Sequence, residues 1–199
     1  MIGAVVENII GGYLHPRASV RRMLGAGHGL DVAFTMLALV VVVNEIFMII
    51  TPGLMPDPPG PVLERYISHI RSVLISFGIF STLICFVGRA FGGKGTFPQT
   101  VLVLAWYELV TCALFPLIQS AMVQVFDAVR AVDAAADQPL EIPAAPFIVL
   151  FISCGVTLWL LAAYIAELHG FARVRNVLAM IFGLLIPLSM LASIFIKIG

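Results

Sequence analysis

Five long apolar runs constrain this chain more than any other feature. Each is close to the roughly 20 residues that a helix needs to cross a bilayer. They extend over residues 30–50, 67–87, 97–121, 146–168 and 174–196. Of the 199 residues, 61% are hydrophobic and 11% are charged, whereas soluble domains carry about 25% charged residues. Lipid must therefore solvate most of the surface, and we predict an all-α integral membrane protein with five transmembrane helices.

Residues 1–29 precede this membrane domain, which comprises residues 30–199. Their apolar side chains recur every three or four residues: Ile2, Val5, Val6, Ile9, Ile10, Tyr13 and Leu14. Pro16 ends the pattern, and the basic residues Arg17, Arg21 and Arg22 follow it. This pattern predicts a short amphipathic helix in the membrane interface, with a basic linker on an anionic leaflet. A terminal helix packed on the bundle would show the same pattern, so both interpretations stay open.

Basic residues in the links predict the orientation of the chain. Five spans place seven of them on one side: Arg17, Arg21, Arg22, Arg89, Lys94, Arg173 and Arg175. The other side holds three: Arg65, Arg130 and Lys197. Because short cytoplasmic loops carry the excess of Lys and Arg, we expect a cytoplasmic N-terminus and a C-terminus on the opposite side.

Ionisable residues within or at the edge of spans are the candidate functional or structural polar sites, because charge is costly in lipid. They are Glu45, His69, Arg71, Glu108, Glu167 and His169. Similar depth predicts that Glu45 pairs with Arg71, or with His69 if the helix rotation differs. Glu108 lies near the middle of the third span. It is interpreted either as the centre of a polar, proton-linked path or as a buried polar contact to Ser72 or Ser76.

A glycine-rich loop follows the second span, and its motif residues are Gly92, Gly93, Lys94, Gly95 and Phe97. The stretch 88–95 nearly fits the phosphate-binding pattern GxxxxGK[ST], but Gly95 stands where a hydroxyl would hold magnesium. We therefore expect a tight re-entry turn with Lys94 among the lipid head groups. No cofactor is expected, and no metal, because the histidines lack metal-binding spacing. The zero net charge gives no reason to expect nucleic-acid binding.

Two stretches resemble the Yip family, the Ypt/Rab-interacting membrane proteins, in its bacterial branch. GGKGTFPQTVLVLAWYELV, residues 92–110, resembles the family's GG-x-G-x-F loop and following helix. WLLAAYIAELHGFARVRNVLAMIFG, residues 159–183, resembles its fourth span, His-Gly turn and fifth span. The resemblance implies five spans, a cytosolic N-terminus and, for a bacterial member, an inner-membrane protein with a periplasmic C-terminus.

The chain departs from the eukaryotic members in two ways. The segment before its first span is short, and it lacks their aromatic-Gly-Pro signature. Binding of Rab-type GTPases is therefore not expected. What the resemblance and the residues together favour is a non-enzymatic membrane protein that organises or remodels the bilayer, or scaffolds copies of itself or other membrane proteins. The alternative is a small transporter or channel with a polar path centred on Glu108.

Cysteine labelling tests the predicted topology. Single cysteines at Asp57 and Asp137 should react with a membrane-impermeant thiol reagent added outside intact cells, and one at Lys94 should not. The unmodified chain serves as the control for background labelling. It has three cysteines of its own, which all lie in apolar runs: Cys85, Cys112 and Cys154. If a cysteine at position 94 is labelled in intact cells, the predicted orientation is wrong.

Overall fold

A computed structural model describes residues 2–50, 62–134 and 144–183, and the regular elements in these ranges are helices. They are α1 Ile2–Leu14, α2 Pro16–Gly25, α3 Leu30–Ile50, α4 Val62–Ala90, α5 Phe97–Thr111, the 3-10 turn η1 Cys112–Leu114, α6 Phe115–Ala134, α7 Ala144–His169 and a last helix Val174–Gly183. The predicted all-α membrane fold is confirmed.

Four segments in the described part of the chain are long and apolar enough to cross a membrane. They are Leu30–Phe47, Tyr66–Ala90, Phe97–Arg130 and Ala144–His169. The helix Val174–Gly183 begins the predicted fifth span. The rest of that span lies outside the described residues. Two further predictions from the sequence fall outside them as well: a kink of the fifth span at Pro187, and a loop over the proline-rich residues 51–61.

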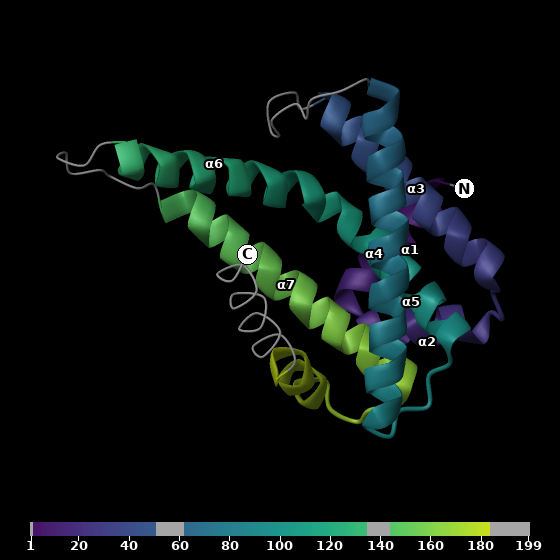
Figure 1. Cartoon of the computed structure of the whole chain (residues 1–199). Helices are drawn as coiled ribbons and strands as arrows, with labels where there is room; N and C mark the ends of the chain where they lie inside the picture. Colours follow the sequence, from purple (N-terminus) through teal and green to yellow (C-terminus); the bar gives the residue numbers. More distant parts are fainter. Residues whose placement is uncertain (1, 51–61, 135–143, 184–199) are drawn as a thin grey trace, which may run out of the picture.

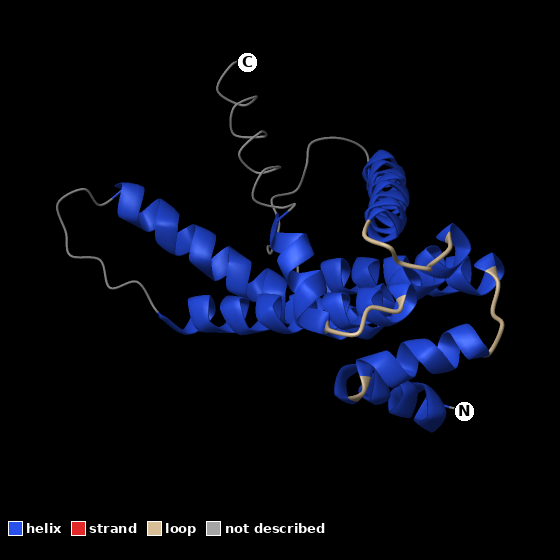
Figure 2. Ribbon diagram, turned by 90° about the horizontal axis from the view of Figure 1, so that it is seen from below, coloured by secondary structure: helices blue, strands red, loops and turns tan. Residues whose placement is uncertain are grey.

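The centre of the fold is the contact of α5 with α7. Leu104 of α5 and Leu161 and Ile165 of α7 are nearly fully buried, and Ile84 of α4 packs against them. On the other side of α5, α2 and α3 contribute buried apolar side chains. Figure 1 shows α6 running beside α7, away from α3, and the two helices pack together. Seen from below, α4 is viewed nearly along its axis, whereas α6 and α7 lie across the view (Figure 2).

The predicted third span differs from the helices observed. Residues 97–121 do not form one helix, because α5 ends at Thr111 and a 3-10 turn leads into α6. Pro116 explains where the chain restarts, since proline has no N–H to donate but fits the first turn of a helix. The apolar residues Met122, Phe126, Val129 and Val132 recur at helical spacing, which predicts a separate short helix after the third span. They lie instead in the later part of the longer helix α6.

The N-terminal segment forms two helices where one helix and a linker were predicted. Pro16 ends α1 as expected, but it also begins α2, whose side chains Val20 and Met23 are buried in the core. Figure 2 shows α1 and α2 side by side, beneath the rest of the molecule in that view. The basic linker is therefore a packed helix.

One face of α1 is held tightly against the bundle. The Tyr13 hydroxyl donates a hydrogen bond of 2.7 Å to the carbonyl of Val110, and burial raises the pKa of Tyr13. At Gly12, an added Cβ would lie 2.8 Å from a Val110 methyl and 3.0 Å from the Tyr164 hydroxyl. Beside Tyr13, on the flank turned away from Gly12, three large apolar side chains are exposed: Val6, Ile10 and Leu14. Helix α1 thus packs on the bundle and also keeps an exposed apolar stripe.

Two adjacent glycines of α1 test this close approach. Gly12→Ala should lower the melting temperature of the detergent-solubilised protein, because overpacking of this kind costs about 1–3 kcal/mol. Gly11→Ala is the matched control, since nothing lies within 4 Å of its added Cβ. It should leave stability unchanged or raise it by up to about 1 kcal/mol through helix propensity. Equal melting temperatures in the two variants would mean that α1 is not packed here.

Candidate functional site

The ends of α4 and α7 have the same backbone geometry. At the end of α4, Gly92 has φ +84°, and the amide of Gly93 donates to the carbonyl of Gly88 at 2.8 Å. At the end of α7, Gly170 has φ +73°, and the amide of Phe171 donates to the carbonyl of Ala166 at 2.8 Å. Both are Schellman caps, in which a left-handed residue, usually glycine, ends the helix. Each cap turns the chain sharply at the same end of the bundle.

His169 lies between these two helix ends and is only 2% exposed. Three glycines line its imidazole: Gly88 in the last turn of α4, and Gly93 and Gly95 in the loop that follows. A side chain at Gly88 would overlap the ring, one at Gly93 would start 2.5 Å from Nδ1, and one at Gly95 would start 3.0 Å from the ring. The backbone amide of Lys94 donates to the His169 carbonyl at 3.2 Å. We call this arrangement of Gly88, Gly93, Lys94, Gly95 and His169 the glycine–histidine junction.

The imidazole of His169 is held in place by close packing more than by hydrogen bonds. Within the described residues, neither ring nitrogen of His169 has a hydrogen-bond partner. The backbone of Ile84 interacts with the ring without reaching hydrogen-bond geometry. Phe171 stacks on it, with the ring centroids 5.7 Å apart. The junction therefore depends on the absence of side chains at Gly88 of α4 and at the glycines of the loop.

Glu167, two residues before the end of α7, connects the N-terminal helices to this junction. Its two carboxylate oxygens accept hydrogen bonds from Nε of Arg17 at 2.8 Å and Nε of Arg21 at 2.9 Å. Arg17 also donates to the carbonyls of Phe171 and Ala172. The Glu167 side chain is 12% exposed, against 37% for Arg17 and 72% for Arg21. Arg17 is therefore the more deeply placed partner of a clamp that joins α2 to α7.

This clamp changes the interpretation of the basic linker. Arg17 and Arg21 were predicted to face the membrane surface, but the structure places both guanidinium groups on Glu167. Arg22 donates a hydrogen bond of 3.3 Å to the side chain of Asn8 in α1. In the described residues, no group of three His, Cys, Asp or Glu side chains is placed to hold a metal ion.

The other predicted polar residues lie away from the junction. Glu45 of α3 approaches His69 of α4, with 3.4 Å between Oε1 and Nε2. This is the second of the two predicted pairings, and Arg71 is exposed. Glu108 is half-buried in α5. The serines expected to bond it, Ser72 and Ser76, are exposed and donate no hydrogen bond to it.

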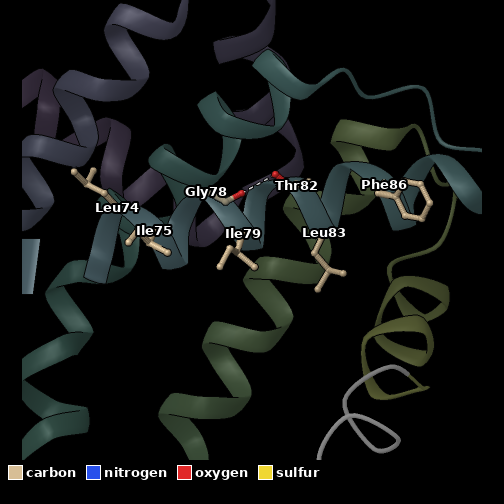
Figure 3. A pocket seen from close by; sticks show the side chains of 7 residues that line it. All are labelled: Leu74, Ile75, Gly78, Ile79, Thr82, Leu83 and Phe86. Carbon is tan, nitrogen blue, oxygen red and sulfur yellow. Dashed lines mark hydrogen bonds between the residues drawn. The ribbon is translucent and has the colours of Figure 1, made fainter. Parts of the chain in front are cut away.

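A shallow apolar groove runs along the outer face of α4. It is lined by Leu74, Ile75, Gly78, Ile79, Thr82, Leu83 and Phe86. Figure 3 shows Ile75, Ile79 and Leu83 pointing to the same side of the helix, with the Thr82 hydroxyl bonded to the Gly78 carbonyl at 2.8 Å. Because the one polar side chain is already bonded to its own helix, this face suits contact with lipid chains.

Sequence reasoning found the junction only in part. It singled out the loop glycines and His169 separately, and the structure brings them together. It missed Gly88 as a contact of the imidazole, Tyr13 as a donor to α5, and the hydrogen bond of 2.9 Å from the Trp106 indole to Ser19. The helix-ending glycines were the available signal, since Gly92 and Gly170 each follow an apolar run and precede a turn.

The fold and the junction define a class: a multi-pass helical membrane protein in which a glycine-rich loop encloses a histidine of a later span. The family model for the Yip1 domain matches residues 10–195. The chain therefore belongs to the Yip family, and the predicted resemblance to this family is confirmed. Searches of curated proteins and of solved structures found no match.

Two glycines of α4 test the junction. Gly88→Ala should destabilise the protein by about 1–3 kcal/mol, because the new methyl overlaps the imidazole. Gly78→Ala is the control in the same helix, since nothing lies within 4 Å of its added Cβ. His169→Ala should remove the clash, so thermal melting of the double variant should show a loss smaller than the sum of the single losses. If the two losses of stability are simply additive in the double variant, Gly88 and His169 do not interact.

Proposed function

We propose that this Yip-family protein is a non-enzymatic component of the bacterial inner membrane that organises or reshapes the bilayer. The N-terminal helices lie on the cytoplasmic side in this proposal, as the basic residues predict. The observation that supports it most is the apolar stripe of α1, which is exposed although the helix is attached to the membrane-spanning core.

The stripe combines exposure with firm attachment. Val6 is 48% exposed, Ile10 51% and Leu14 67%. An amphipathic helix of this kind buries its apolar face at the boundary between head groups and acyl chains of one leaflet. Area added to one leaflet only favours curvature, and the attachment to α5 and α7 keeps that helix at a constant position relative to the spans.

The attachment comes from two separate contacts. Tyr13 bonds to the backbone of α5, and Arg17 and Arg21 bond to Glu167 of α7. Because the first contact anchors α1 and the second anchors α2, and the two helices pack on each other, α1 and α2 are held as one unit. A rigid unit transmits membrane insertion to the spans, whereas a helix on a flexible tether would not.

A second candidate function is transport through a path that includes Glu108. The observation that favours it is the helix break. Glu108 lies one turn before η1, where α5 gives way to α6. Broken helices near the middle of the membrane form the substrate and ion sites of many transporters, and a carboxylate beside such a break is suited to binding a proton or a cation.

Reconstituted vesicles test the first function. Wild-type protein should reduce the diameter of vesicles containing anionic lipid, or draw them into tubules, as seen by electron cryomicroscopy. Ile10→Asn should abolish most of this effect, because it places an amide in the apolar stripe. Glu7→Gln, on the exposed polar part of the same helix, should behave as wild type. If Ile10→Asn folds normally and reshapes vesicles as wild type does, the stripe is not responsible.

The same vesicles separate the two candidates. Loaded with a pH-sensitive dye, they report proton flux under an imposed gradient. The bilayer-organising function predicts the same flux for wild type, Glu108→Gln and protein-free vesicles. A wild-type flux well above protein-free vesicles that is lost in Glu108→Gln would favour transport.

A further inference from the structure

Apart from Arg22, whose side chain bonds to Asn8 of α1, the basic residues predicted on the cytoplasmic side fall into two groups. Arg17 and Arg21 are paired with Glu167. Four others have exposed side chains and no ion pair within the described residues: Arg89, Lys94, Arg173 and Arg175. Counted along the chain, all six look alike, and only the packing of α2 against α7 distinguishes them.

The junction brings the four unpaired cations into two neighbouring segments. Arg89 lies in the last turn of α4 and Lys94 in the loop that follows. Arg173 lies between the turn of α7 and the helix Val174–Gly183, and Arg175 lies in the first turn of that helix. The hydrogen bond from the Lys94 amide to the His169 carbonyl joins these two segments. Figure 1 shows them passing close together at the lower end of the molecule.

Exposed aromatic side chains accompany the cations. Phe91 is 65% exposed in the turn after α4, and Phe97 is 45% exposed at the first position of α5. Both lie at the ends of apolar helices that are long enough to cross a membrane. Aromatic rings and long basic side chains at that position lie at the level of the lipid head groups.

We propose that Arg89, Lys94, Arg173 and Arg175 form a binding site for the phosphate-bearing head groups of anionic phospholipids. The main argument is charge complementarity between the protein and the lipid, because four cations without acidic partners lie at the depth of the anionic head groups. Arginine is well suited to such a site, since its guanidinium group binds phosphate through two parallel hydrogen bonds. The site does not depend on the proposed function, because a bilayer-organising protein and a transporter could both contain it.

The site can be tested by measuring which phospholipids the protein prefers to bind. Wild-type protein in phosphatidylcholine bilayers should bind spin-labelled phosphatidylglycerol more tightly than phosphatidylcholine with the same chains, as read from the motionally restricted fraction of the label. Each cation near an anionic surface contributes about a fivefold preference at low salt. The preference should fall as salt is raised from about 0.05 to about 0.5 M, since the Debye length shortens.

Paired substitutions locate the site. Arg89→Gln with Lys94→Gln, and separately Arg173→Gln with Arg175→Gln, should each lower the preference at least tenfold, or to none if the wild-type preference is smaller. The matched control is Arg71→Gln with Arg130→Gln, which removes two exposed cations from other parts of the chain and should leave the preference unchanged. Arg17→Gln should lower the melting temperature and keep the lipid preference.

Several outcomes would overturn the proposal. Equal binding of the two lipids by wild type would do so, as would an equal loss in the control pair and the two site pairs. Inorganic phosphate added at constant ionic strength should not compete. If it displaces phosphatidylglycerol, the cations bind a soluble anion and not a lipid head group. If one of the two double variants does not fold, the other double variant and the salt dependence of the wild type still test the proposal.

Discussion

The imidazole of His169 can lie between two helix ends only because glycines line it on the side of α4 and the loop. Inside a bilayer the hydrophobic effect does little to bring helices together, because lipid chains are as apolar as the helices themselves. Close packing and hydrogen bonds between backbones must do so instead. The junction supplies both, since the ring fills the space beside Gly88 and Gly93, and the adjacent carbonyl accepts the Lys94 amide. Where α4 and α7 end, their contact depends on this side chain and on the missing side chains around it, and one turn earlier on Ile84, which packs against Leu161 and Ile165.

The position of the central helix follows from the same loop. Gly95 and Thr96 lead from the junction into α5, where the Gln99 side chain accepts a hydrogen bond of 3.0 Å from the Thr96 amide and stabilises the first turn. A shift of the loop would therefore shift α5, and α5 is the helix on which α1, α2, α3 and α4 all pack. The Glu167 clamp acts at the opposite face of the α7 end and adds the N-terminal helices. Loop, central helix and N-terminal pair thus share one anchoring point.

Hydropathy predicted the parts of the fold that depend on the lipid solvent, and it did not predict the parts that depend on contacts between distant residues. The first span was predicted over 30–50, where α3 lies. Two prolines limited the rest: Pro16 was interpreted only as the end of a helix although it also begins one, and Pro116 was hidden within an apolar run. The pairing of Arg17 with Glu167 joins residues 150 positions apart. No periodicity records such a contact, because each partner alone looks like a surface charge.

Charge counting illustrates why sequence and structure answer different questions about the same residues. The orientation rule treats the basic residues of short loops as equivalent, because it concerns insertion, when Asp and Glu contribute little. After folding they are no longer equivalent. Glu167 neutralises much of the field of Arg17 and Arg21, and Arg22 bonds to a neutral side chain. The field at the lipid head groups therefore comes mainly from the cations that the junction holds on its exposed side. Folding turns a uniform excess of positive charge into one part that binds the helices together and one part that faces the membrane.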